Sequence, residues 1–111
     1  NLLTFMINNC RFNSTAYVPY IPATGTLRLD SDKVVYTKDK YMRLQTPMVF
    51  PFYQFYGCYN KAKDKGIEYQ TASDLYEDNS GLVNYVMGNR LNFKVTFAED
   101  IDVVRLLYNH E

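Results

Sequence analysis

The sequence predicts a mainly β (α+β) fold, that is, a small antiparallel sheet, sandwich or partly open barrel with a C-terminal helix. Short runs of β-branched and aromatic residues, separated by Asn, Pro, Gly, Ser and Asp, fill the first half of the chain. After Phe97 the apolar residues change from a period of two to a helical period. Because the chain has 111 residues, 47% of them apolar, we expect residues 1–111 to form a single globular domain.

The expected strands of the first half share this β-branched and aromatic composition. They are Leu2–Ile7, Ala16–Tyr20, Thr26–Asp30, Lys33–Thr37, Tyr41–Leu44 and Met48–Tyr56. Proline cannot donate a hydrogen bond to a sheet, so Pro51 makes the last run an edge strand or divides it in two. The charged segment 60–66 is expected to be a loop. Segment 71–81 is expected to be another, with a short helical turn at 72–76 that Thr71 and Asp74 cap.

The clearest local pattern lies in segment 82–97. Apolar and polar residues alternate from Leu91 to Phe97, which is typical of a strand with one buried face. Gly88-Asn89 predicts a hairpin turn that pairs this strand with the run before it. The acidic residues Glu99, Asp100 and Asp102 then favour the first turn of a C-terminal helix. A metal site built from the same carboxylates is the alternative that we consider weaker.

Composition excludes several classes of protein. Twelve basic residues balance twelve acidic ones, which argues against a strong electrostatic binder of nucleic acid. No apolar stretch approaches the roughly 20 residues of a membrane-spanning helix, so a soluble protein is expected, in a location that the sequence leaves unknown. Eleven Tyr, ten Asn and no Trp are typical of A/T-rich genomes, such as those of many viruses and low-GC bacteria, and a virus-encoded protein is the interpretation that we carry forward.

Cys10 and Cys58 are the only two cysteines. We expect them to be free thiols inside the core, which is the common state of isolated cysteines in an intracellular chain. A disulfide is the alternative, and the glycosylation sequon at residues 13–15 would suit the exported protein in which such a bond forms.

Candidate catalytic residues are few. His110 is the only histidine and lies next to the end of the sequence, where a side chain is poorly held for proton transfer. The cysteines lack the CxxC spacing of a zinc site, and no glycine-rich loop suits a nucleotide phosphate. The sequence therefore predicts a non-enzymatic protein without metal or cofactor. An enzyme with an unfamiliar acidic site ranks third among the alternatives.

Two groups of residues are candidates for binding. The first is a dense aromatic run that predicts an interaction or assembly module, binding a protein partner or itself; it comprises Phe50, Phe52, Tyr53, Phe55, Tyr56 and Tyr59. The second interleaves basic and aromatic residues and predicts, as the alternative function, weak binding of single-stranded nucleic acid; it comprises Lys33, Tyr36, Lys38, Lys40, Tyr41 and Arg43.

Overall fold

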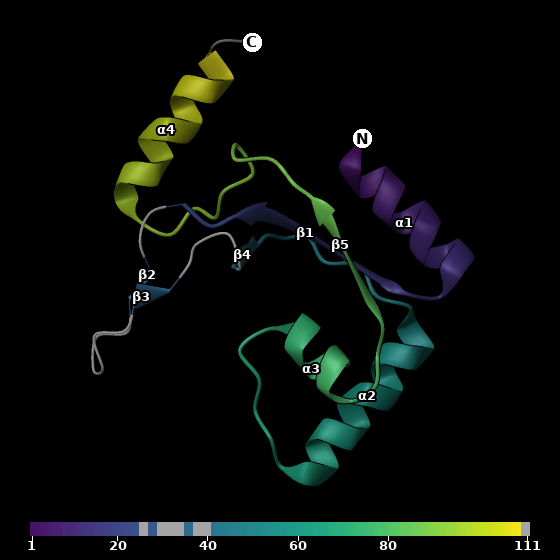
Figure 1. Ribbon diagram of the computed structural model, residues 1–111. Coiled ribbons are helices and arrows are strands. Elements are labelled where there is room, and N and C mark those ends of the chain that lie inside the picture. Colours follow the sequence, from purple (N-terminus) through teal and green to yellow (C-terminus); the bar gives the residue numbers. More distant parts are fainter. Residues whose placement is uncertain (25–26, 29–34, 37–40, 110–111) are drawn as a thin grey trace.

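The computed structural model describes residues 1–24, 27–28, 35–36 and 41–109. Figure 1 shows the elements, which follow in the order α1 (Leu2–Asn13), β1 (Ala16–Pro22), β2 (Leu27–Arg28), β3 (Val35–Tyr36), β4 (Met42–Leu44), α2 (Phe52–Lys65), α3 (Ala72–Asp78), β5 (Val83–Met87) and α4 (Ala98–Asn109). Helices contain more of the described residues than strands do. The expected mainly β fold is therefore wrong, and the chain has an α/β fold.

Strand β1 is the centre of a three-stranded mixed sheet with the order β4-β1-β5. It pairs in parallel with β5, from Ala16 opposite Val83 to Tyr20 opposite Met87, and antiparallel with the short strand β4. The predicted hairpin is wrong, because β5 pairs with β1 and segment 91–97 forms no strand. Strands β2 and β3 form a separate antiparallel pair.

Segment 2–7, expected to be a strand, belongs to helix α1. The side chain of Asn1 caps this helix by accepting a hydrogen bond from the Thr4 amide at 2.8 Å. Met6 and Cys10, four residues apart, fall on the same face of the helix and are buried against β1. A run of six residues is too short to distinguish the two-residue period of a strand from the 3.6-residue period of a helix. The N-terminal cap and the burial of one helical face favour the helix.

Helix α2 replaces both the expected edge strand at 48–56 and the expected loop at 60–66. Pro51 precedes its first turn with φ of −70°, an angle that suits a helix start, and Gly66 ends it in the left-handed conformation. Cys58 and Ala62 lie one turn apart and are buried. The lysines of the supposed loop lie on the exposed side and near the C-terminus of the helix, where positive charge is favourable.

The core lies on both faces of the sheet. Neighbouring residues of a strand point to opposite faces, so Tyr17 packs with Met6 and Cys10 of α1, whereas Ala16 packs with Cys58 of α2 and Tyr76 of α3. Figure 1 shows α1 on one side of β1 and β5, and α2 and α3 on the other. The two cysteines belong to different clusters and are free thiols, as expected.

Two predicted helical segments are confirmed. Helix α3 begins where the Thr71 hydroxyl accepts a hydrogen bond from the Asp74 amide at 3.2 Å, and α4 begins at Ala98 with acidic residues in its first turn. Figure 1 shows α4 apart from the other helices, and none of its described residues is buried. Within the described ranges, no helix has the length and apolarity needed to cross a membrane.

Candidate anion-binding site

A pocket of about 590 Å³ lies where strands β1 and β5 end. Its lining comes from Ile21 of β1, from β4 and the two residues after it, from the loop that joins β5 to α4, and from Asp100 in the first turn of α4. Strands β1 and β5 run parallel, so their carboxyl ends meet at the same edge of the sheet. Ligands of α/β proteins bind at this edge, because the loops that leave the strands converge there.

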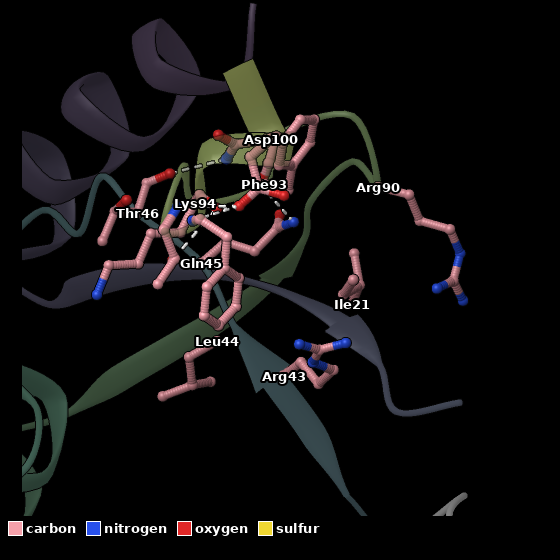
Figure 2. Close-up of a pocket in the computed structure, with 12 residues that line it drawn as sticks. Ile21, Arg43, Leu44, Gln45, Thr46, Arg90, Phe93, Lys94 and Asp100 are labelled. Atoms are coloured by element: carbon pink, nitrogen blue, oxygen red, sulfur yellow. Dashed lines mark hydrogen bonds between the residues drawn. The ribbon is translucent and has the colours of Figure 1, made fainter. Parts of the chain in front are cut away.

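Three cations line the pocket: Arg43, Arg90 and Lys94. Figure 2 shows that they come from separate segments, with Arg43 on β4 and the other two on the loop after β5. Among the residues that the structure describes, none of the three has an acidic partner within 4.0 Å, and the ion pair that is present joins Arg105 to Asp102 on α4. The pocket therefore offers unneutralised positive charge to an anionic ligand.

Asp100 is the acidic residue of the pocket lining. One of its carboxylate oxygens accepts hydrogen bonds from the backbone amides of Thr96 and Phe97, at 2.9 and 3.0 Å. These two bonds hold the pKa of Asp100 below its usual value. The carboxylate thus caps the start of α4. The interpretation as a helix start is confirmed for Glu99 and Asp100, which lie in the first turn, whereas Asp102 lies beyond it. In the described part of the chain, no group of three or more His, Cys, Asp or Glu residues could hold a metal ion.

Gln45 links the two sides of the pocket. Its side-chain nitrogen donates to the carbonyl oxygens of Asn89 and Asn92, both at 2.8 Å, and its side-chain oxygen accepts from the Asn89 amide at 3.2 Å. The Asn92 side chain returns a bond to the Thr46 carbonyl at 2.7 Å (Figure 2). Four hydrogen bonds therefore tie the residues after β4 to the loop after β5.

The predicted aromatic site divides between two environments. The ring of Phe50 meets the buried ring of Tyr76 edge-on, with centroids 5.3 Å apart, and the ring of Phe55 stacks on Tyr76 at 6.0 Å, so both belong to the core. Phe52 and Tyr53 are exposed in 72% and 83% of their surface, and Tyr56 and Tyr59 are also exposed. The exposed four lie on α2, where Phe52 stacks on Tyr56.

The predicted nucleic-acid site is not assembled within the described residues. Lys33, Lys38 and Lys40 lie outside them, and of Tyr36 only the place of its backbone in β3 is described. Tyr41 is exposed beside β4. Arg43 belongs to the pocket instead.

Sequence reasoning missed Arg90 and Lys94, because it assigned the loop after β5 to a hairpin. The signal that points to them is a pair of basic residues shortly after the end of a half-buried strand, where site residues of α/β proteins gather.

Fold and pocket together define the class of this chain: an α/β protein with a candidate anion-binding pocket at the carboxyl ends of parallel strands. Residues 2–108 match the family described as "IspD: 2-C-methyl-D-erythritol 4-phosphate cytidylyltransferase", and the chain belongs to this family.

Similar proteins agree with this assignment. The chain is 31% identical over 111 residues to the "Bifunctional enzyme IspD/IspF" of Wolbachia pipientis wMel, covering 97% of this chain and 26% of that protein. A cytidylyltransferase structure from Thermus thermophilus has a TM-score of 0.86 at 23% identity, over 97% of this chain and 55% of that one. A structure of the 4-diphosphocytidyl-2C-methyl-D-erythritol synthase from Anaerococcus prevotii has a TM-score of 0.80 at 26% identity, over 97% of this chain and 50% of that one. The chain thus spans about a quarter of the bifunctional relative and about half of the solved structures.

The expectation of a virus-encoded, β-rich assembly module without enzymatic activity is wrong. The family is one of enzymes, its solved structures share the α/β fold, and the relatives named above are bacterial proteins. The alternative, a nucleic-acid-binding domain, is wrong for the same reason.

Proposed function

We propose that this chain forms part of an enzyme that transfers a cytidylyl group to 2-C-methyl-D-erythritol 4-phosphate, and that the pocket binds the phosphate of this substrate. Membership of the family supports the reaction. The observation that carries the binding role is the group of three cations, Arg43, Arg90 and Lys94, without an acidic partner among the described residues.

The charge of the pocket matches a phosphate monoester. Such a group carries a charge of about −1.5 to −2 at neutral pH. Guanidinium groups can donate two parallel hydrogen bonds to it, and an ammonium group acts as a point charge. Thr46 and Thr96 add neutral polar residues to the lining.

Neutralisation of the phosphate also suits the proposed reaction. One oxygen of the substrate phosphate attacks the phosphorus of the cytidylyl group, forming a new P–O bond while the bond from that phosphorus to the leaving group of the donor breaks. Two negatively charged groups must approach each other in this step. Fixed cations lower that repulsion without reorganising during the reaction. The name of the Anaerococcus prevotii protein, a 4-diphosphocytidyl-2C-methyl-D-erythritol synthase, describes a product with such a linkage.

Calorimetric titration of the chain with 2-C-methyl-D-erythritol 4-phosphate tests the binding role. Replacing Arg90 or Lys94 with Gln should weaken binding at least about tenfold, since a hydrogen bond to a charged group contributes about 1.5–3 kcal/mol. Lys63→Gln is the matched control, because this lysine is exposed on α2 and does not line the pocket.

Two results would contradict the proposed binding role. The dephosphorylated polyol could bind as tightly as the phosphate, or the pocket variants could match Lys63→Gln. For the reaction itself, the enzyme is supplied with a cytidine nucleotide and the substrate, and phosphorus NMR should detect a new diphosphate linkage. Its absence in a preparation that binds the substrate would refute the activity.

Self-association is a further part of the proposal. The exposed rings of Phe52, Tyr53 and Tyr56 support it, because clustered aromatic side chains bury a large area with few torsions to freeze. A second copy of the chain is the proposed partner of this face of α2.

A further inference from the structure

The side chain of Gln45 is about nine-tenths buried, with 9% of the residue's surface exposed. Its side-chain amide both donates and accepts hydrogen bonds there. The nitrogen donates to two carbonyl oxygens, and the oxygen accepts from one backbone amide. All three backbone groups belong to Asn89 and Asn92. A buried amide that makes several bonds to a single loop fixes the position of that loop, because each bond left unmade would leave a polar group unpaired.

The loop that Gln45 holds is a tight turn. The Asn92 amide donates to the Asn89 carbonyl at 2.9 Å, which places Arg90 and Leu91 at the corner. The Asn89 side chain supports the turn by accepting from the Leu91 amide at 2.8 Å. Arg90 thus lies in a turn whose two flanking residues, Asn89 and Asn92, are both hydrogen-bonded to Gln45. Lys94 lies two residues after Asn92.

Gly88 allows this close contact. It precedes the turn, and its amide donates to the Tyr20 carbonyl at 2.7 Å. A Cβ atom added at Gly88 would lie 2.1 Å from the side-chain oxygen of Gln45, far inside van der Waals distance. The backbone at Gly88 therefore has to lack a side chain for the Gln45 amide to occupy its place.

We infer that Gln45 is a positioning residue: its side-chain amide holds the 89–92 turn so that Arg90 and Lys94 are fixed at the pocket before the substrate phosphate binds. The identity of the ligand in this inference, the substrate phosphate, rests on the proposed function. Its structural part rests only on the hydrogen bonds. Preorganised cations bind more tightly, because the cost of ordering a loop does not have to be met on binding.

The test compares Gln45→Leu with Gln70→Leu, a matched control at an exposed glutamine outside the pocket. Hydrogen exchange followed by NMR should show faster exchange in Gln45→Leu at the amides of 88–94, with α1 and α2 unchanged. Affinity for 2-C-methyl-D-erythritol 4-phosphate should fall about tenfold, as expected when two long side chains must be ordered on binding. Gln70→Leu should change neither quantity.

Gly88→Ala provides a second variant that leaves Gln45 in the sequence but displaces its amide. It should reproduce both effects, and combining it with Gln45→Leu should add little, since both changes remove the same interaction. Should Gln45→Leu reduce thermal stability too far for measurement, Gly88→Ala together with Gln45→Glu still tests the role. The Glu side chain keeps the shape and the acceptor but cannot donate to the two carbonyls.

The outcomes separate this inference from the proposed function. If the unaltered protein fails to bind the phosphate, the proposed binding role is wrong, and exchange at 88–94 still decides whether Gln45 holds the turn. If the protein binds the phosphate and both Gln45→Leu and Gly88→Ala bind it equally well, the positioning role is refuted. Faster exchange spread over the whole chain would also refute it, because it would show a general stabilising role.

Discussion

At the scale of single residues, Asp100 shows how one carboxylate serves the start of a helix. Its side chain accepts from two backbone amides that would otherwise lack partners at the N-terminus of α4. The negative charge also lies at the positive end of the helix dipole. Both effects favour the ionised form, in agreement with the lowered pKa of Asp100.

This pKa predicts how the stability of α4 depends on pH. Since the pKa of Asp100 is lower in the folded chain than the usual value of about 3.9, its stabilisation is fully present above that value and disappears as the pH falls through the folded pKa. Asp100→Asn should therefore speed amide exchange in α4 at neutral pH and should match the parent chain at strongly acidic pH. Asp102→Asn, which removes only an exposed ion pair, is the control and should change little. Equal effects of the two substitutions at neutral pH would contradict the capping role.

At the scale of elements, α2 shows how the helical period sorts a continuous aromatic run. Residues 52, 53 and 56 project to solvent, whereas Phe55 and Cys58, three residues apart, lie on the face toward α3. In a strand, residues 53 and 55 would share a face. In the helix they lie in different environments.

The two faces of α2 should respond differently to substitution. Tyr53→Glu should change the free energy of unfolding by no more than about 0.5 kcal/mol, as is usual for an exposed site, and should reduce any self-association. Phe55→Ala should cost about 3 kcal/mol, because its ring packs on Phe50 and Tyr76. Urea denaturation measures the free energy of unfolding, and size-exclusion chromatography with light scattering measures the self-association. A Tyr53→Glu chain that is folded and associates as before would place the self-association surface elsewhere.

At the scale of the whole molecule, the buried residues concentrate around β1, and the described residues of α4 contribute none. The radius of gyration is 16.7 Å, larger than the roughly 13 Å typical of a compact domain of this length. Large apolar side chains of α4, such as Leu106 and Tyr108, are exposed in 61% and 72% of their surface. The chain spans about half the length of the solved structures that it matches.

This distribution predicts a wide range of local stability. Amides of β1, paired on both sides, should exchange most slowly, and those of α4 should exchange almost as fast as in an isolated helix, which is marginal at 12 residues. Hydrogen exchange measured by mass spectrometry on the 111-residue chain tests this. Helix α1 is the internal control, because it has the same length but buries Met6 and Cys10. Protection of α4 equal to that of α1 would show that α4 finds a partner surface.

The sequence by itself determined the features that depend on neighbouring residues. The strand at Ala16–Tyr20, the Thr71 cap of α3, the acidic start of α4 and the free thiols were all correctly predicted, since caps and local composition act over a few residues. The α/β fold was not predicted. The runs at 2–7 and 48–56 are short enough to fit either period, and packing against β1 decided that they are helical or precede a helix.

Only the tertiary structure decided the candidate site. Arg43 lies 47 residues before Arg90 in the sequence, and the two meet because β5 crosses over to pair in parallel with β1 while β4 pairs on its other side. Such pairing joins residues far apart in the chain and leaves no mark in local composition. Gln45 shows the same dependence, because its role exists only once the loop after β5 has been brought against the end of β4.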